Sequence, residues 1–256
     1  MSSETKKVLI TGGAGGLGKA IAEAFLKASY TVTILDRNAT LLATAISELS
    51  SQGSVHGIEC DITSQTAVTE AIAESVKFFG ELDIVINNAG IMDRLDPVGD
   101  VDMDLFQKVL NINLVAPAIV SKAAIKHWET RSKGPAGGVI LNIGSAAGAR
   151  GFVAGAAYTS SKHGLIGLTK NTAAYYRHKG IKCNIILPGG MQTNISDSFS
   201  TGIHQQGLEL YQKASATGME MLDIGKVART CVFLCGEDAE LVNGVCIAVD
   251  VGWSAH

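Results

Sequence analysis

A hydroxyl, a phenol and an amine occur at a spacing that could transfer a proton. Tyr158 lies thirteen residues after Ser145, and Lys162 lies four residues further on, one helical turn from Tyr158. A free phenol has a pKa of about 10, and a neighbouring ammonium group lowers it by favouring the phenolate. We therefore predict that Tyr158 exchanges a proton with a substrate oxygen to which Ser145 hydrogen-bonds. Each residue also has a structural explanation, as a turn serine, a tyrosine at the core edge and an exposed lysine.

A glycine-rich turn near the N-terminus could bind a dinucleotide. The run Thr11-Gly12-Gly13-Ala14-Gly15-Gly16-Leu17-Gly18 follows a strand pattern and opens a helix pattern. Glycines at such a turn let the backbone approach a pyrophosphate, and the helix N-terminus offers free N–H groups and the positive end of its dipole. Glycine-rich turns also occur for packing alone, so this motif needs support from the rest of the chain.

The residues that end the second predicted strand bear on the choice of cofactor. Asp36 lies twenty residues after Gly16, where a carboxylate can accept hydrogen bonds from ribose hydroxyls and would repel a 2′-phosphate. Arg37 beside it could instead pair with that phosphate. No Lys or Arg lies between Gly13 and Gly15 to assist. The balance favours NAD(H), and NADP(H) stays open as the alternative.

The elements that must position these residues alternate along the whole chain. Short β-branched runs alternate with longer segments of helical period, a pattern typical of a doubly wound α/β fold with a parallel sheet and helices on both faces. Seven strands are predicted at Lys7 to Thr11, Thr31 to Asp36, Val55 to Cys60, Leu82 to Asn87, Gly138 to Ile143, Lys182 to Ile186 and Val245 to Val249. Helices are predicted at Leu17 to Ala28, Ala39 to Ser51, Gln65 to Phe79, Asp104 to Arg131, Tyr158 to His178 and Asp223 to Cys235.

One segment breaks the alternation. Residues 190–222 are rich in Ser, Gly, Met and Gln, and a long irregular insertion after a strand is typical of a substrate-binding lid. We expect residues 1–256 to form one catalytic domain that carries this lid. The lid and nearby loops offer apolar residues that favour an apolar ligand, or that pack the lid on the body: Phe152, Val153, Met191, Ile195, Phe199, Ile203, Leu208, Tyr211, Met219 and Met221.

Six motifs in this order resemble the short-chain dehydrogenase/reductase family, of the compact single-domain kind. They are Thr11 to Gly18 (TGxxxGxG), Cys60-Asp61-Ile62, Asn87 to Gly90 (NNAG), Tyr158 to Lys162 (YxxxK), Pro188-Gly189 followed by Thr193, and Val242-Asn243-Gly244. The resemblance spans nearly the whole chain and implies a Rossmann fold. It implies hydride transfer between a nicotinamide cofactor and a secondary alcohol or ketone.

The resemblance also assigns roles to residues. It implies a catalytic set of Asn113, Ser145, Tyr158 and Lys162, with Asn111 as a less favoured rival of Asn113. The cofactor would contact Gly12, Gly16, Leu17, Gly18, Asp36, Arg37, Asp61, Ile62, Asn88, Ala89, Gly90, Tyr158, Lys162, Pro188, Gly189 and Thr193. The leading function is an NAD(H)-dependent alcohol dehydrogenase or ketone reductase. An NADPH-dependent carbonyl reductase of biosynthesis is the alternative, and a dinucleotide-sensing protein without turnover is a third.

Composition excludes several other classes of partner. Charged residues make up 18% of the chain and the net charge is -3, so no basic field would gather nucleic acid or acidic lipid. The N-terminus carries no signal-peptide pattern, and the apolar stretches are too short to span a bilayer, so we expect a cytoplasmic protein without membrane insertion. Five cysteines form no CxxC pair, and no metal site is expected. The partners expected are a small-molecule substrate and, from the resemblance, further copies in a homodimer or homotetramer.

Overall fold

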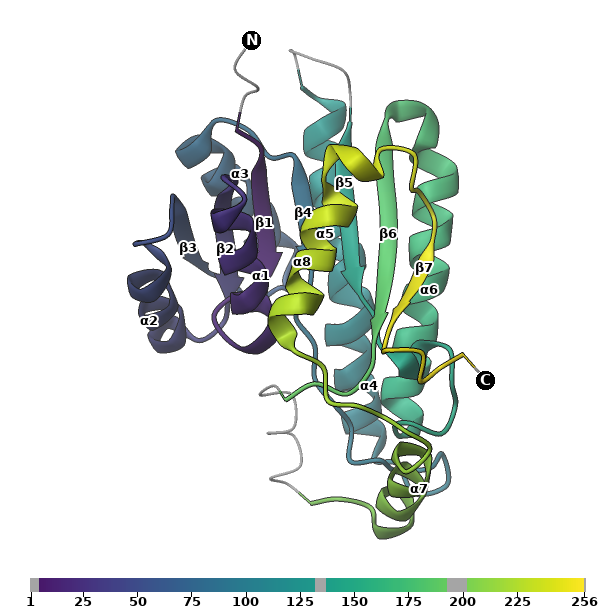
Figure 1. Cartoon of the computed structure of the whole chain (residues 1–256). Coiled ribbons are helices and arrows are strands. Elements are labelled where there is room, and N and C mark those ends of the chain that lie inside the picture. Colours follow the sequence, from purple (N-terminus) through teal and green to yellow (C-terminus); the bar gives the residue numbers. More distant parts are fainter. Residues whose placement is uncertain (1–4, 132–136, 193–201, 256) are drawn as a thin grey trace.

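One parallel sheet organises the chain. The computed structural model describes residues 5–131, 137–192 and 202–255. Seven strands lie in the order β3-β2-β1-β4-β5-β6-β7, and every neighbouring pair is parallel. The strands are β1 (Lys7–Thr11), β2 (Thr31–Asp36), β3 (Val55–Glu59), β4 (Ile84–Asn87), β5 (Gly138–Ile143), β6 (Ile181–Pro188) and β7 (Cys246–Val249). All seven point toward one edge of the sheet, at the bottom of Figure 1.

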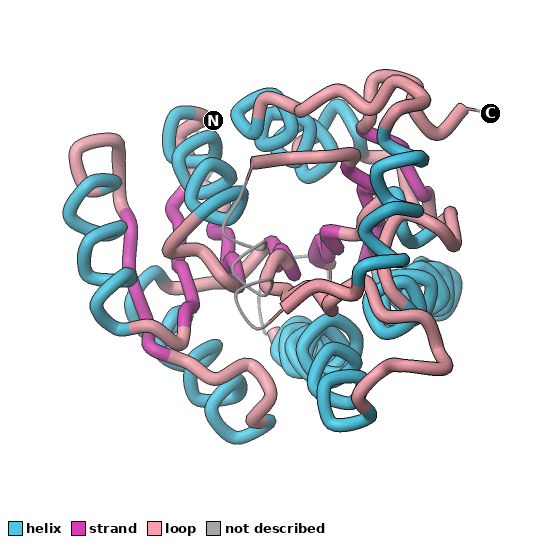
Figure 2. The backbone as a smooth tube through the Cα atoms, turned by 90° about the horizontal axis from the view of Figure 1, so that it is seen from below, coloured by secondary structure: helices cyan, strands magenta, loops and turns pink. Residues whose placement is uncertain are grey.

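Two layers of helices cover the sheet because successive strand residues face opposite sides. Val8 and Ile10 of β1 pack with α1 (Gly16–Lys27), α2 (Ala39–Leu49) and α8 (Ile224–Cys235), whereas Leu9 packs on the other face. That face is covered by α3 (Gln65–Phe79), α4 (Met103–Leu110), α5 (Ala116–Glu129) and α6 (Ala156–Tyr176). Figure 2, seen from the carboxyl edge, shows the strands between these two layers. The predicted doubly wound, seven-stranded α/β fold is confirmed.

The strand predictions agree with the structure to within a few residues, but two helix predictions need correction. The helix expected over Asp104 to Arg131 is the run Met103–Glu129, in which α4 and α5 are joined by a π-helical turn, η1 (Asn111–Val115). There the N–H of Ala116 donates to the carbonyl of Asn111, five residues back, a local widening that apolar periodicity does not reveal. Helix α6 begins at Ala156, two residues earlier than expected.

The helix Met103–Glu129 is also long and apolar enough, by length and composition, to cross a membrane, and no other helix in the described ranges is. In this fold its α5 part packs against α3, and its α4 part packs against α6. These are the contacts of a core helix.

The segment after β6 is more regular than predicted. It contains helix α7 (Gln205–Ser215), which lies beyond the carboxyl ends of the strands (Figure 1). His204 caps this helix, since its ring nitrogen Nδ1 accepts a hydrogen bond from the N–H of Gly207 at 3.1 Å. Histidine is not among the residues preferred at a helix start, so the sequence carried no ordinary start signal there.

Buried amides cross the middle of the sheet. Asn87 of β4 and Asn142 of β5 are register partners, and Asn87 Nδ2 donates to Asn142 Oδ1 at 2.8 Å. Asn142 Nδ2 in turn donates to Thr169 Oγ1 of α6 at 2.8 Å, and Asn87 Nδ2 lies 3.2 Å from Ser121 Oγ of α5. Both asparagines are buried. The network therefore ties the two central strands to the helices beneath them.

We expect Trp128→Ala to destabilise the fold by about 3 to 5 kcal/mol, the usual cost of removing a large buried aromatic ring. Trp128 is 1% exposed, its ring fills the space above Gly138, and its Nε1–H donates to the carbonyl of Leu82 at 2.7 Å. Urea unfolding measures the change. Tyr175→Ala, at a side chain 67% exposed, serves as control and should stay within about 0.5 kcal/mol of the parent. Equal losses in the two variants would contradict this account of the core.

Candidate active site

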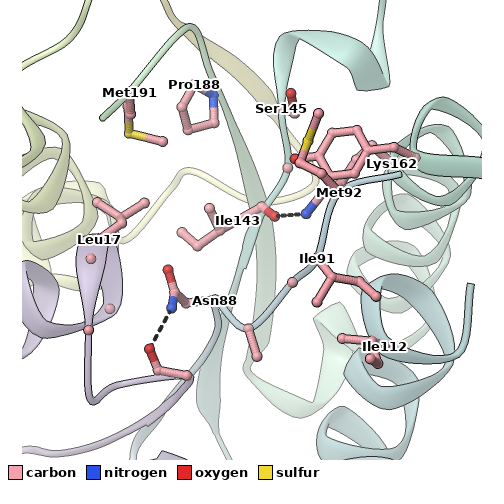
Figure 3. A pocket seen from close by; sticks show the side chains of 18 of the residues that line it. Leu17, Asn88, Ile91, Met92, Ile112, Ile143, Ser145, Lys162, Pro188 and Met191 are labelled. Atoms are coloured by element: carbon pink, nitrogen blue, oxygen red, sulfur yellow. Dashed lines mark hydrogen bonds between the residues drawn. The ribbon is translucent and has the colours of Figure 1, made fainter. Parts of the chain in front are cut away.

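A cavity of about 1100 Å³ lies at the carboxyl edge of the sheet. It is formed by the loops that follow β1, β2, β3, β4, β5 and β6, with α7 and the C-terminal Trp253 at one end. Figure 3 shows Leu17, Pro188 and Met191 on one side of this cavity, and Ser145, Lys162 and Met92 on the other. A position between β1 and β4, where the strand order reverses, is the usual ligand site of an open α/β sheet.

A hydrogen-bonded joint holds the first and fourth loops together at that point. Thr11 Oγ1 accepts hydrogen bonds from the N–H groups of Asn88 at 3.0 Å and Ala89 at 3.1 Å. Asn88 Nδ2 returns two, to the carbonyl oxygens of Thr11 at 3.0 Å and Gly12 at 3.1 Å. The NNAG segment and the glycine turn are thereby held as one rigid surface.

The glycine turn forms a cradle that side chains would fill. Gly12 and Gly16 have φ angles of 62° and 49°, in the left-handed region that favours glycine. A Cβ added to Gly18 would lie 2.1 Å from the carbonyl oxygen of Gly12. Helix α1 begins here without a side-chain cap, and Gly15, Gly16, Leu17 and Gly18 at its start line the cavity. These features fit a bound pyrophosphate.

Two carboxylates lie at the far end of the cradle. Asp36, at the end of β2, accepts hydrogen bonds from the N–H groups of Ala14 at 3.3 Å and Asn38 at 3.0 Å. Hydrogen bonds from the side chain and backbone of Thr63 lower the pKa of Asp61, and the charge of Arg37 lowers it further. Asp36, Arg37 and Asp61 all line the cavity. Two acidic side chains and one basic side chain thus lie together where an adenosine ribose would lie.

Ser145, Tyr158 and Lys162 meet at the other end of the cavity. Ser145 follows β5, whereas Tyr158 and Lys162 lie one turn apart on α6 and are both buried. Lys162 Nζ donates to the carbonyl oxygen of Ile143 at 2.9 Å, as Figure 3 shows, and lies over the Tyr158 ring, 5.4 Å from its centroid. The structure therefore brings together the three residues whose spacing predicted proton transfer.

Burial shifts the pKa values of the phenol and the amine in opposite directions. It raises the pKa of Tyr158 to about 12, although the side-chain hydrogen bond to Ser145 acts to lower it. It lowers the pKa of Lys162 to about 8. The direction at Tyr158 is opposite to that expected from the Tyr-Lys spacing, because desolvation of the phenolate is the largest cause.

Asn113 lies behind the cavity wall. It is 1% exposed on the π-helical turn η1, and its amide is bonded to the backbone of Ile91: Oδ1 accepts from the N–H at 2.9 Å and Nδ2 donates to the carbonyl at 2.9 Å. Nδ2 also lies 3.2 Å from Ser161 Oγ. A Cβ at Gly90 would lie 3.2 Å from Asn113 Oδ1 and 3.7 Å from Lys162 Nζ, so these three residues are close neighbours. The rival Asn111 lines the cavity.

The other predicted cofactor residues gather as expected, with one exception. Those that line the cavity are Gly12, Gly16, Leu17, Gly18, Asp36, Arg37, Asp61, Ile62, Asn88, Ala89, Gly90, Tyr158, Lys162, Pro188 and Gly189. Thr193 lies outside the described residues. No group of His, Cys, Asp or Glu within 5–131, 137–192 and 202–255 has an arrangement that could hold a metal ion.

Sequence reasoning found part of the apolar wall and missed the rest. Of the apolar residues expected there, Val153, Met191, Leu208, Tyr211 and Met219 line the cavity. Phe152, Ile203 and Met221 are exposed, and Ile195 and Phe199 lie outside the described residues. Met92, Leu95 and Trp253 were missed because they lie outside the predicted lid. The buried carboxylate of Asp93, which contacts the start of α6, was missed as well.

Known proteins match this chain over nearly its full length. A family model for the short chain dehydrogenase matches residues 6–203. A short chain dehydrogenase/reductase of Colletotrichum higginsianum is 42% identical, over 98% of this chain and 94% of its own. The 3beta-hydroxysteroid dehydrogenase 2 of Eggerthella lenta is 34% identical, over 97% and 94%.

A solved structure agrees with the fold. The 3-ketoacyl-(acyl-carrier-protein) reductase of Brucella melitensis in complex with NADH has a TM-score of 0.86 and 25% identity, covering 99% of this chain and 100% of that one. The predicted resemblance is confirmed by these matches and by the convergence of the motifs on one cavity. The chain belongs to the short-chain dehydrogenase/reductase family of oxidoreductases, which bind NAD(P)(H) and act on small molecules.

Proposed function

We propose that the protein transfers a hydride between NAD(H) and a secondary alcohol or ketone on an apolar, fused-ring compound. The observation that carries the proposal is the convergence of Ser145, Tyr158 and Lys162 at one end of a cavity whose other end is the glycine cradle. A proton-transferring phenol and a dinucleotide cradle in one cavity are the two parts that this reaction requires.

The apolar wall and the relatives support the class of substrate. Met92, Leu95, Val153 and Trp253 line the catalytic end of the cavity together with lid residues Leu208, Tyr211 and Met219. A wall of this kind binds a large apolar scaffold and leaves few polar groups to orient it. The relative named as a 3beta-hydroxysteroid dehydrogenase acts, by its name, on a ring hydroxyl of such a scaffold.

The chain's own residues account for the proton. In oxidation, Tyr158 as phenolate takes the proton of the hydroxyl that Ser145 holds, and in reduction the neutral phenol returns it. The chemistry that a bound nicotinamide supplies is acceptance of the hydride from the alcohol carbon, and its return in reduction. Lys162 would hold the nicotinamide ribose. Asn113 anchors the loop at Ile91 and, through a water molecule, connects Lys162 to solvent.

The glycine cradle and its neighbours would hold the cofactor. The N–H groups at the start of α1 would bind the pyrophosphate, Asp36 would bind the ribose hydroxyls, and Asp61 would contact the adenine. Thr193 would contact the carboxamide of the nicotinamide. NADP(H) is the second candidate, and it is favoured by Arg37, which lies in the same cavity close enough to Asp61 to lower the pKa of that residue.

We further propose that residues 1–256 form one catalytic domain in which residues 190–222, with α7, act as the substrate lid. The protein works in the cytoplasm, as a homodimer or homotetramer without membrane insertion. Light scattering that found only a 26.7 kDa particle would exclude the oligomer.

We expect Tyr158→Phe to lower kcat for a fused-ring secondary alcohol by about 100-fold or more, because general acid-base catalysis contributes at least about that factor. NADH binding, followed by fluorescence, should stay near the parent value. Tyr175→Phe changes an exposed tyrosine on the same helix and serves as control. Near-normal turnover in Tyr158→Phe would exclude Tyr158 as the base. A parent protein that binds NADH but turns over no alcohol or ketone would instead favour a dinucleotide sensor.

The rate should depend on pH differently in the two directions of the reaction. Because burial raises the pKa of Tyr158 to about 12, the neutral phenol predominates near neutrality and the phenolate grows as pH rises. We expect kcat/KM for alcohol oxidation to increase between about pH 6 and about pH 10, whereas ketone reduction, which uses the neutral phenol that predominates over this whole range, should stay nearly constant. Steady-state kinetics in both directions tests this, and an oxidation rate independent of pH would contradict it.

The cofactor preference should follow Asp36. We expect the parent to bind NADH about tenfold or more tightly than NADPH, and Asp36→Ala to lose most of that difference, because the carboxylate binds ribose hydroxyls and repels a 2′-phosphate. Fluorescence titration with both cofactors measures it. Arg37→Ala is the matched variant: a selective loss of NADPH binding there, with tighter NADPH in the parent, would establish the NADP(H) alternative.

A further inference from the structure

The carboxylate of Asp93 is buried against the first turn of the helix that carries Tyr158. Asp93 is 0% exposed, in the loop after β4. Its Oδ2 accepts the N–H of Tyr158 at 2.8 Å, and its Oδ1 accepts the N–H groups of Gly155 at 3.1 Å and Leu95 at 3.1 Å. One side chain thus satisfies three backbone donors, two of which begin α6.

Helix α6 depends on this remote carboxylate because it has no cap of its own. Helices α2, α3, α4, α7 and α8 begin with side-chain caps at Asn38, Ser64, Asp102, His204 and Asp223. The N-cap residue of α6 is Gly155, which has no side chain to accept a hydrogen bond. A Cβ at Gly155 would lie 2.5 Å from the Asp93 carboxylate, so the glycine makes room for a cap supplied from another loop.

The loop that supplies the cap is itself held in a constrained shape. Leu95 has a φ of 64°, unusual for a residue with a side chain, and its N–H is the third donor to Asp93. The carbonyl of Asp96 accepts the N–H of Ala156 at 2.8 Å, a second link to the first turn of α6. The same loop contains Ile91, whose backbone N–H and carbonyl are both hydrogen-bonded to the side chain of Asn113.

We propose that Asp93 is a positioning residue that, by capping α6 from the loop after β4, sets the place of Tyr158 relative to the cofactor cradle. The inference rests on the proposed function only in taking Tyr158 as the proton-transferring group. The loop that contains Asn88, Ala89 and Gly90 also carries Asp93, so the cradle and the catalytic helix are joined through a few residues.

The position of Asp93 also places a negative charge behind the phenol. Burial is the largest cause of the raised pKa of Tyr158, and the charge of Asp93 raises that pKa as well. Three other charged groups lie near Asp93 and Tyr158. Asp96 Oδ2 lies 3.5 Å from Nε of Arg94, and Nζ of Lys162 lies over the ring of Tyr158. Removing the charge of Asp93 should therefore lower the pKa of Tyr158, an effect that loss of a structural cap elsewhere would not have.

The test compares Asp93→Asn with Asp223→Asn, which alters an equivalent cap on α8, away from the cavity. Ionisation of Tyr158 is followed by NMR of protein labelled with ¹³C at the tyrosine ζ carbon, and the signal among the five tyrosines is assigned by its loss in Tyr158→Phe. At about pH 11, one unit below the pKa of Tyr158, we expect a larger ionised fraction of Tyr158 in Asp93→Asn than in the parent, and no change in Asp223→Asn. We expect kcat to fall about tenfold or more in Asp93→Asn, because small displacements of a reacting group are costly.

A second variant keeps the test informative if Asp93→Asn folds poorly. Asp93→Ala removes the carboxylate and opens space at Gly155, so Gly155→Ser added to it gives α6 a local cap of a preferred type. We expect Asp93→Ala alone to lower the midpoint of thermal unfolding by roughly 2 to 8 °C. The added substitution should restore that midpoint and most of kcat, while the ionised fraction of Tyr158 stays above the parent's.

An ionised fraction equal to the parent's in both Asp93 variants would overturn the proposal. A kcat in Asp93→Ala equal to that of Asp223→Asn would also overturn it. The NMR measurement needs no substrate, so it separates this inference from the proposed function. If the parent oxidises none of the alcohols tested but the Tyr158 signal responds to Asp93, the substrate class is wrong and the positioning role stands.

Discussion

The joint between Thr11 and Asn88 is the constraint on which the site depends. Its four hydrogen bonds join the loops after β1 and β4, the two strands between which the chain reverses its direction of travel across the sheet. The glycine cradle lies on one side of this joint, and the loop that leads to Asp93 lies on the other. A parallel sheet leaves its strand ends open at one edge, and the joint closes that edge into a defined surface.

The helices around that surface differ in how the N–H groups of their first turn are satisfied. Helices α2, α3, α4, α7 and α8 begin with side-chain caps and α5 continues from η1, whereas the N-cap residues of α1 and α6 are Gly15 and Gly155, without a capping side chain. The free N–H groups of α1 are left for a phosphate, and those of α6 are taken by Asp93. The start of α1 thus lies at the glycine cradle, and the start of α6 lies beside Tyr158.

The fold and most of the site could be predicted because their signals are local. Alternating strand and helix periods locate the sheet, and the glycine turn, NNAG and YxxxK each lie in one short stretch. Asp93 could not be found in this way, because its partners Gly155 and Tyr158 are 62 and 65 residues away and are backbone groups of no particular residue type. Helix α7 was hidden by its histidine cap, and the direction of the Tyr158 pKa shift depends on burial, which spacing alone does not reveal.

The amide chain across β4 and β5 bears on how the sheet assembles. Asn87 and Asn142 find each other, and through Asn142 the hydroxyl of Thr169, only when the two strands pair in a single alignment. A slip of one strand by one residue would turn its amide to the opposite face of the sheet, away from its partners, and a buried amide left unbonded costs about 1 to 3 kcal/mol. Apolar neighbours such as Val85 and Ile86 or Ile140 and Leu141 tolerate slippage far better. The asparagines thus favour one alignment of the two central strands over the mispaired ones.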